Sequence, residues 1–310
     1  MFKKLANLIY EHEFAFGVLG LIVSFLYLII VPRTPTIWRC VPLALSWFSV
    51  FLIGDQLNKR MGNGSIFPHR KDQLHKLKRL AAAGFFMNLI NDASGAFMTR
   101  LWYYPGFDPF WYFLFFAPIG YMLFGIILYI FYKFFKQRWD YLVKPGRMGK
   151  LSCRLYVWVQ YLELFIGIFG IILSYKYFGI LIKEYGVIWY EIFARVDIPV
   201  SVGMVFFSWL SIFFILEFVC FILKRETLTR DLFRGNFIPF FSILGASVLC
   251  IIFVELFNTP FQIWVFHNWP LDHVRLFAIP IVAYLVWPSQ YLLLLPIIRL
   301  FDGKNEENVW

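Results

Sequence analysis

One long apolar stretch indicates the fold class of this chain. Residues 199–223 read PVSVGMVFFSWLSIFFILEFVCFIL and contain a single charged residue, Glu217. A helix needs about 20 mostly apolar residues to cross a bilayer, so this stretch predicts a membrane-spanning helix. Together with this one, eight such stretches occur along the chain, at 14–32, 37–54, 80–101, 110–132, 156–175, 199–223, 239–260 and 276–298. The sequence therefore predicts an all-α polytopic membrane bundle of about eight transmembrane helices.

The composition of the whole chain excludes other broad classes of protein. Of its 310 residues, 60% are hydrophobic and 15% are charged, whereas soluble domains are about 45–50% apolar and about 25% charged. Disorder requires few apolar residues and a disulfide scaffold requires many cysteines, so both are excluded. The 4 cysteines and 5 histidines are scattered, with no CxxC, HxxH or HxxxH spacing. We therefore expect no metal site and no cofactor, which excludes metal-dependent lipid desaturases and hydroxylases.

The excess of positive charge follows the pattern of a membrane topology. The chain carries 29 Lys and Arg against 19 Asp and Glu. About three quarters of these cations fall at the termini and in the connections 55–79, 133–155 and 224–238, all on one side of the predicted spans. Both termini are therefore expected to be cytoplasmic, with the basic connections against membrane lipids. No nucleic acid is needed to explain this charge, and no nucleic-acid recognition motif is present.

Two parts of the chain resemble each other at an offset of about 162–165 residues, which indicates an internal repeat. Asp92 corresponds to Glu255, and Pro118 corresponds to Pro280. In both copies an acid precedes a small or polar turn, a Trp-x-Phe/Tyr motif, a proline and a further span. We expect two four-helix halves, 1–150 and 151–310. Because each half has an even number of spans, the repeat is predicted to be parallel.

Four acidic residues lie inside the predicted spans, where ionisable groups are costly and commonly functional. Asp92 and Glu255 occupy corresponding positions and are expected to face one central cavity. Glu163 and Glu217 lie about six to eight residues from the inner surface and are expected to meet at one depth. These four are the candidate catalytic residues. The alternative is that neighbouring polar groups satisfy each acid, which then only fixes helix packing.

Polar and aromatic residues near these acids are the candidate substrate-binding residues. Asn88 lies one helical turn before Asp92 on the same face. Arg100 follows, where it either binds an anionic group or extends to the outer surface. The full set is Asn88, Arg100, Trp102, Tyr104, Asn258, Gln262, Trp264 and His267. The connection 176–198 mixes aromatic and charged residues and predicts a helix in the membrane interface.

Part of this pattern is shared with a known group of membrane proteins. Asp92, Ala93 and Gly95 are followed by Trp102, Tyr104 and Pro118, an order that resembles the integral-membrane lycopene cyclases and related carotenoid-modifying proteins. The resemblance implies a duplicated helical fold and an isoprenoid or carotenoid substrate, and we expect a bacterial or archaeal cytoplasmic membrane. The Pro-x-Glu-Glu motif of that family, whose acids are thought to act on the isoprenoid double bond, is absent. In its place stand Pro118-Ile119-Gly120-Tyr121 and Pro280-Ile281-Val282-Ala283.

Three functions remain open. The first is an enzyme acting on an apolar lipid, with Asp92 or Glu255 as general acid and the Trp102 and Trp264 rings stabilising a carbocation. The second is a non-enzymatic lipid- or pigment-binding module, or an accessory subunit with partner membrane subunits. The third is a transporter that couples to protons through the buried acids.

Overall fold

The computed structural model describes residues 8–30, 38, 40–62, 64–67, 71–140, 142, 149–185 and 192–301. Most of these residues are helical. The long helices are α2 (Glu13–Ile30), α3 (Cys40–Arg60), α4 (Lys71–Asp92), α6 (Ala117–Trp139), α7 (Lys150–Tyr185), α8 (Val202–Ile222) and α10 (Ile238–Phe261). The shorter ones are α5 (Pro109–Trp111), α9 (Leu228–Phe233), α11 (Ile281–Gln290), α12 (Leu294–Phe301), the π-helices η2 (Ala93–Met98) and η3 (Tyr112–Phe116), and the 3-10 turn η5 (Tyr291–Leu293). The strands are β1 (Trp102–Tyr103), β2 (Val265–Phe266), β3 (Arg275–Leu276) and β4 (Ile279–Pro280).

Among the described residues, six helical segments are long and apolar enough to cross a membrane. They are Glu13–Ile30, Pro109–Trp139, Lys150–Tyr185, Val202–Ile222, Ile238–Phe261 and Ile281–Phe301. These segments correspond to six of the eight predicted spans. The other two predicted spans fall on α3 and on α4 with η2. α4 begins with the charged run KDQLHKLKR, and α3 ends with Lys59 and Arg60.

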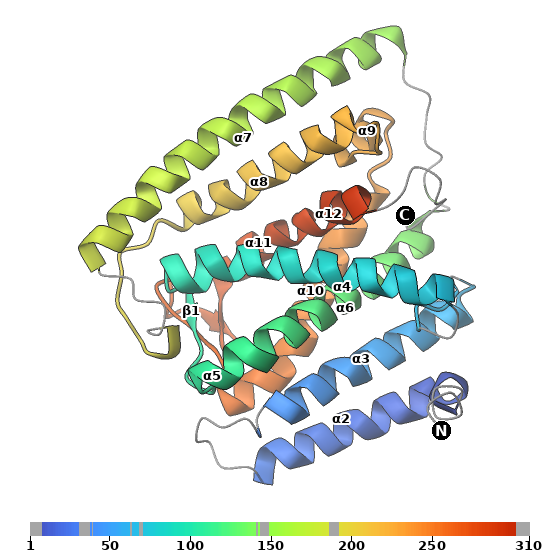
Figure 1. Ribbon diagram of the computed structural model, residues 1–310, viewed down its shortest axis with the longest axis vertical. Coiled ribbons are helices and arrows are strands. Elements are labelled where there is room, and N and C mark those ends of the chain that lie inside the picture. The colour runs from blue at the N-terminus through green and yellow to red at the C-terminus, as the bar shows by residue number, and fades with distance from the viewer. Residues whose placement is uncertain are drawn as a thin grey trace.

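The helices form a row in which neighbours pack along their lengths (Figure 1). α2 packs on α3, α3 packs on α6, and α6 packs on both α4 and α10. At the other end α7 packs on α8, and α8 contacts α11 and α12. α2 and α7 therefore lie at opposite edges, and both expose many large apolar side chains. Such faces are expected of helices that contact lipid.

Helix α7 is longer than the sequence predicted. Instead of an interfacial helix over 176–198, residues 176–185 continue α7 to Tyr185, and 186–191 lie outside the described residues. No proline interrupts the helix, and a single glycine such as Gly179 only weakens one. At 1.5 Å per residue, α7 is about 54 Å long, whereas the hydrocarbon core is about 30 Å thick. The prediction was wrong because mixed polarity alone does not end a helix.

Glycines bring each edge helix close to its neighbour. A Cβ atom added to Gly17 of α2 would lie 2.9 Å from the backbone oxygen of Ser49 on α3. A Cβ added to Gly167 of α7 would lie 2.9 Å from the backbone oxygen of Ser211 on α8. Small residues permit such close backbone approach between membrane helices. The two edge pairs are therefore packed by the same kind of contact.

A glycine contact also sets α4 against α6. A Cβ on Gly84 would lie 2.6 Å from Gly125 Cα and 2.8 Å from the backbone oxygen of Tyr121. We expect Gly84→Ala to lower the free energy of unfolding by about 1–3 kcal/mol, because these backbone atoms cannot turn aside. Gly179→Ala is the control, since nothing lies within 4 Å of a Cβ there. Equilibrium unfolding in mixed micelles measures both variants, and equal stability would contradict the prediction.

The connections that follow α4, α7 and α10 are fixed to one another. β1 pairs with β2 in antiparallel register, with Trp102 opposite Phe266. The side-chain amide of Asn268 donates to the backbone oxygens of Arg100, over 3.1 Å, and Val196, over 2.9 Å. The turn after α4 is thereby held beside the turn after α10, which places their polar side chains around one region of the core.

Candidate functional site

A change of helical geometry after α4 brings an indole and a phenol back onto Asp92. The π-helix η2 follows Asp92 directly, and Arg100 then adopts φ 54°, where the chain turns into β1. Gly95 leaves room for the Trp102 ring, which would overlap a Cβ at that position. Insertions of π-helix occur frequently at functional sites. Here the insertion returns Trp102 and Tyr104 to the carboxyl group.

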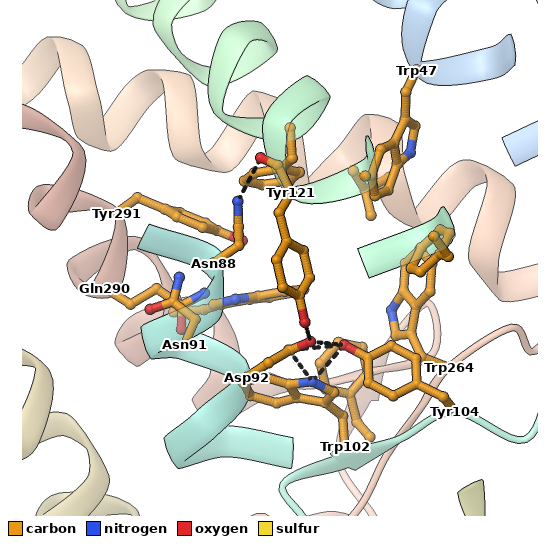
Figure 2. Close-up of a pocket in the computed structure, with 16 residues that line it drawn as sticks. Trp47, Asn88, Asn91, Asp92, Trp102, Tyr104, Tyr121, Trp264, Gln290 and Tyr291 are labelled. Atoms are coloured by element: carbon orange, nitrogen blue, oxygen red, sulfur yellow. Dashed lines mark hydrogen bonds between the residues drawn. The ribbon is translucent and has the colours of Figure 1, made fainter. Parts of the chain in front are cut away.

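The buried carboxyl group of Asp92 accepts hydrogen bonds from four side chains. Figure 2 shows three of them, Trp102, Tyr104 and Tyr121. Trp102 Nε1 donates to Oδ1 over 3.0 Å, and the Tyr104 hydroxyl lies 2.8 and 2.9 Å from the two oxygens. The Tyr112 hydroxyl donates to Oδ2 over 2.6 Å, and the Tyr121 hydroxyl also donates to Oδ2. None of these donors carries a positive charge. Because a carboxylate offers about four lone-pair positions, they can satisfy its hydrogen-bonding capacity.

Asp92 lies in the wall of a cavity of about 80 Å³. A buried water needs about 10–15 Å³, so the cavity has room for several small groups. Most of its lining is aromatic, namely Trp47, Trp102, Tyr104, Phe116, Tyr121, Phe124, Trp264, Phe266, Trp287 and Tyr291. The remaining lining residues are Asn88, Asn91, Asp92, Gly120, Val254 and Gln290.

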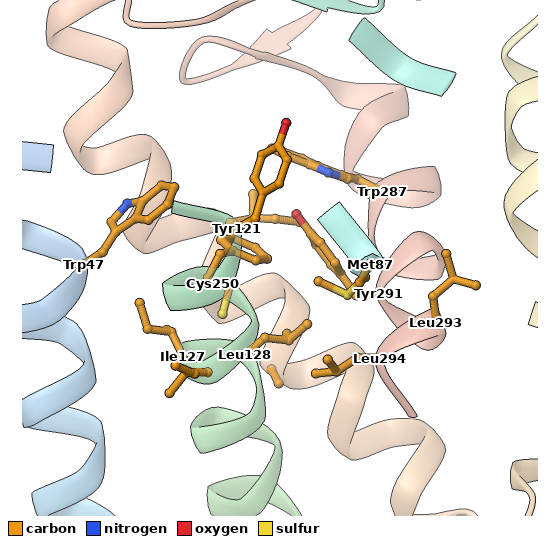
Figure 3. Packing of buried hydrophobic residues seen from close by; sticks show 14 of the residues in the cluster. Trp47, Met87, Tyr121, Ile127, Leu128, Cys250, Trp287, Tyr291, Leu293 and Leu294 are labelled. Atoms are coloured by element: carbon orange, nitrogen blue, oxygen red, sulfur yellow. The ribbon is translucent and has the colours of Figure 1, made fainter. Parts of the chain in front are cut away.

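The aromatic wall continues into the aliphatic core. Figure 3 shows Tyr121 and Tyr291 beside Leu128 and Cys250, with the Tyr121 hydroxyl pointing away from these apolar side chains. The rings of Phe124 and Tyr291 have centroids 5.1 Å apart. Tyr121 therefore presents its ring to the core and its hydroxyl to Asp92, so that the polar end of the cavity is at the carboxyl group.

Glu255 is held in a comparable way at the end of α10. Trp264 Nε1 donates to Glu255 Oε1 over 2.9 Å, and Asn258 Nδ2 donates to Oε2 over 3.0 Å. Asn258 also accepts from the Trp264 backbone N–H over 2.9 Å. The Trp264 side chain lines the cavity whereas Glu255 does not, so Trp264 links Glu255 to the cavity. Of the two acids expected to share a cavity, only Asp92 lines it.

Glu163 and Glu217 come together at the start of α9. Thr229 Oγ1 donates to Glu163 Oε1 over 2.5 Å, and the Thr229 backbone N–H donates to Glu217 Oε2 over 3.1 Å. Arg299 on α12 lies 3.9 Å from Glu217 and 2.7 Å from Asp231. None of these residues lines the cavity. The two acids belong to a buried polar network that joins α7, α8, α9 and α12.

The predicted substrate-binding residues fall into two groups of four. Those that line the cavity are Asn88, Trp102, Tyr104 and Trp264. Those that do not are Arg100, Asn258, Gln262 and His267.

Arg100, Gln262 and His267 have other surroundings. Arg100 is 1% exposed and donates to the Ala96 backbone oxygen over 2.9 Å, so it does not extend to the surface as one alternative expected. Gln262 terminates α10 in a left-handed conformation with φ 50°. His267 Nε2 lies 2.6 Å from Asp197 Oδ1, and this hydrogen bond holds the pKa of the Asp197 carboxyl below its ordinary value. The hydrogen bond between His267 and Asp197 joins the connection after α10 to the connection after α7.

Several polar residues of the site were not predicted. Asn91, Tyr121 and Gln290 line the cavity, and Tyr112 donates to Asp92 without lining it. Asn91 precedes Asp92 in sequence, which was a usable signal. Tyr112 and Tyr121 are 9 residues apart, which in a regular α-helix puts them on opposite faces. The wider turns of η3 bring both hydroxyls to Asp92. A regular helical periodicity therefore could not find this pair.

Comparison with protein-family models, curated proteins and solved structures finds no match to this chain. Within the described ranges, no group of three or more His, Cys, Asp or Glu side chains is placed to hold a metal ion. The fold and site define a class: a helical protein with membrane-length apolar helices and a carboxyl group in a buried aromatic cavity. Any functional assignment rests on that cavity.

Proposed function

We propose that this chain is an integral membrane protein that binds an isoprenoid lipid in the aromatic cavity and acts on it by acid catalysis. The observation that carries the proposal is the Asp92 carboxyl group, buried in an aromatic wall and contacted by uncharged donors. A carboxylic acid within reach of a bound double bond can protonate it. Aromatic faces attract the positive charge that results.

In the proposed reaction, the double bond takes the proton of Asp92. The π electron pair forms the new C–H bond and leaves a carbocation on the neighbouring carbon, against the rings of Trp47, Trp102 and Trp264. A second double bond of the same chain attacks the cation and closes a ring. This leaves a new carbocation on the other carbon of the second double bond. A neighbouring carbon then gives its proton to Asp92, and the electron pair of that C–H bond forms the double bond of the product. The product is an isomer of the substrate, so the atoms balance without an oxidant or reductant.

The donors around Asp92 suit this role because they point to where negative charge develops. When Asp92 gives up its proton, both oxygens must be stabilised in a site with little water. Trp102, Tyr104, Tyr112 and Tyr121 already supply those hydrogen bonds. Preorganised donors of this kind lower the energy of a charge-forming transition state.

Deuterium transfer tests the proposed function. The purified protein, in vesicles prepared in D₂O, is incubated with geranylgeraniol or squalene, and the extracted lipid is analysed by mass spectrometry and NMR. We expect a cyclised isomer that carries deuterium at the protonated carbon. Recovery of bound but unchanged, undeuterated lipid would contradict acid catalysis.

Removing one donor is expected to slow the reaction without preventing binding. Tyr121→Phe deletes the hydroxyl that contacts Asp92 Oδ2 and keeps the ring in the cavity wall. We expect kcat to fall about 100-fold, as for the loss of one oxyanion-stabilising donor, with KM little changed. Tyr103→Phe is the matched control, because Tyr103 does not line the cavity. A Tyr121→Phe enzyme as fast as the control would be inconsistent with this role.

A binding role without catalysis, as a lipid- or pigment-binding module or an accessory subunit, is the alternative. One observation favours it: the four donors already fill the acceptor positions of Asp92, which leaves the carboxyl group little capacity for a ligand. The alternative predicts an unchanged lipid or a chromophore, or partner subunits, that copurifies in mild detergent. The absorbance and mass of the purified protein test this reading beside the deuterium assay.

We also infer that α3 and α4 cross the membrane, that the halves 1–150 and 151–310 are parallel copies, and that both termini are cytoplasmic. α3 packs between α2 and α6, and α4 packs on α6, so both run beside membrane candidates. A shared pattern supports the repeat, with Glu13, Gly17, Gly20 and Ser24 on α2 matching Glu163, Gly167, Gly170 and Ser174 on α7. Protease accessibility of terminal tags in sealed vesicles tests the orientation.

A further inference from the structure

Two amide side chains in the cavity wall have polar atoms without partners. Asn91 is 3% exposed and Gln290 is 2% exposed. Within the described part of the chain, neither polar atom of the Asn91 amide is hydrogen-bonded, and Gln290 Oε1 accepts no hydrogen bond. Both side chains line the same cavity, and Figure 2 draws them on one side of it. Buried polar atoms without a protein partner are few in folded proteins, so these atoms indicate a ligand or water at that position.

A neighbouring amide shows the contrast. Asn88 also lines the cavity, but its Nδ2 donates to the backbone oxygens of Gly84, over 2.9 Å, and Tyr121, over 3.1 Å. Asn88 therefore contributes to the contact between α4 and α6. The Asn91 amide and Gln290 Oε1 make no comparable bond. The Gln290 side chain is hydrogen-bonded to Tyr291, so Oε1 is the atom of that amide that remains for a ligand.

The charge of the lining restricts the ligand. None of the described residues that line the cavity is Lys, Arg or His, and one of them is Asp92. A diphosphate buried there would have no cation to compensate its charge, which is strongly unfavourable. A hydrocarbon without a polar group would leave the amide atoms of Asn91 and Gln290 unpaired. A hydroxyl group carries no charge, and it can accept from Asn91 Nδ2 and donate to Gln290 Oε1. It therefore pairs two of the three unpaired amide atoms.

We propose that the ligand of this cavity is an uncharged lipid alcohol. Its hydroxyl group binds Asn91 and Gln290, the adjoining carbons lie against the aromatic rings of the cavity, and the rest of the chain extends beyond it. This inference rests on the proposed function, since it takes the cavity as the isoprenoid site and names the chemical class of the isoprenoid. It applies equally if the protein binds the lipid without transforming it.

Competition binding tests the inference. The protein in nanodiscs is loaded with tritiated geranylgeraniol, which is displaced by unlabelled geranylgeraniol, by its diphosphate, or by the same hydrocarbon chain without the hydroxyl group. We expect the hydrocarbon to bind about tenfold more weakly than the alcohol, because the hydroxyl hydrogen bonds are lost. The diphosphate should bind about 100-fold more weakly, because its charge is buried without a counter-ion.

Paired variants assign the preference to the two amides. In Asn91→Leu combined with Gln290→Met, the side chains keep a similar size but lose their polar atoms. The alcohol and the hydrocarbon should then bind with equal affinity. Gln137→Met is the control at an amide outside the cavity, and it should keep the tenfold preference.

The results separate this inference from the proposed function. Equal affinity of the wild-type protein for the alcohol and the hydrocarbon, or tightest binding of the diphosphate, overturns the lipid alcohol, whatever the deuterium assay reports. A tenfold preference for the alcohol with no deuterium transfer supports the inference and contradicts acid catalysis. Failure of all three lipids to bind overturns both.

Discussion

Replacing Asp92 with asparagine is expected to reduce turnover of the bound isoprenoid by about 1,000-fold or more, while the lipid still binds. Asparagine has nearly the shape of aspartate but has no proton to give to a double bond. General acid catalysis by a positioned carboxylic acid contributes about 10²–10⁴-fold to a rate. The amide introduced by Asp92→Asn would keep one acceptor oxygen for Trp102 and the tyrosines, so the cavity should retain its shape. Steady-state kcat and KM, with lipid binding measured in parallel, check this expectation.

Glu255→Gln is the informative comparison, because it removes the acid that contacts Trp264 but does not line the cavity. Its effect should be no more than about tenfold, since Glu255 can act only by positioning the Trp264 ring. Asp272→Asn, at a partly exposed residue paired with Arg275, controls for the substitution itself. Full activity of Asp92→Asn, or an equal loss in Glu255→Gln, would remove Asp92 from the role of general acid.

The fold class could be predicted because membrane spans depend on length and polarity alone. Stretches such as 199–223 are long and apolar enough to be recognised as membrane-spanning helices. This one contains α8. The end of α7 could not be predicted in the same way. Residues 176–185 carry Lys176 and Lys183 yet remain helical, because charged residues at the end of a long helix can extend beyond the hydrocarbon region.

The observation that best supports the proposed duplication lies outside the segments on which the repeat was predicted. That prediction used Asp92 and Glu255 with their neighbours, where aromatic composition produces chance matches. Gly17 and Gly167 carry more information, because each faces the backbone oxygen of a serine, Ser49 or Ser211. A small residue required for close helix approach is harder to match by chance than a phenylalanine in a lipid-facing helix.

The candidate site was only partly predictable. Asp92 was identified because a charge within a span is rare. Trp102 was identified because it follows Asp92 closely in the sequence. Tyr112 and Tyr121 reach the same carboxyl group only through the π-helical turns of η3. Arg100 is buried after a turn with positive φ. Neither local geometry follows from residue type, so the full set of donors required the structure.

Arg299→Met is expected to cause the largest loss of stability, about 3–5 kcal/mol. Arg299 is 3% exposed and lies between Glu217 and Asp231, at 3.9 and 2.7 Å. Removing it leaves both carboxyl groups buried without that cation, beside Glu163. Arg234→Met is the matched control: Arg234 contacts the exposed Glu226 at 3.4 Å, and such surface pairs contribute about 0–1 kcal/mol. Unfolding in mixed micelles compares the two variants.

Two measurements distinguish the loss of the Arg299 charge from the loss of its packing. They are the pH dependence of stability and the effect of neutralising the two acids beside it. Burial raises the pKa of Asp231 above its ordinary value, although Arg299 opposes that shift. In Arg299→Met the opposition is gone, so the folded state holds a proton that the unfolded state releases above about pH 4. The stability of the variant should therefore recover as the pH falls from about 7 toward about 4. Adding Glu217→Gln and Asp231→Asn to Arg299→Met should restore most of the lost stability near neutral pH. No uncompensated charge then remains beside position 299. A loss that neither treatment reduces would mean that Arg299 stabilises α12 by packing, and that the buried acids are neutral.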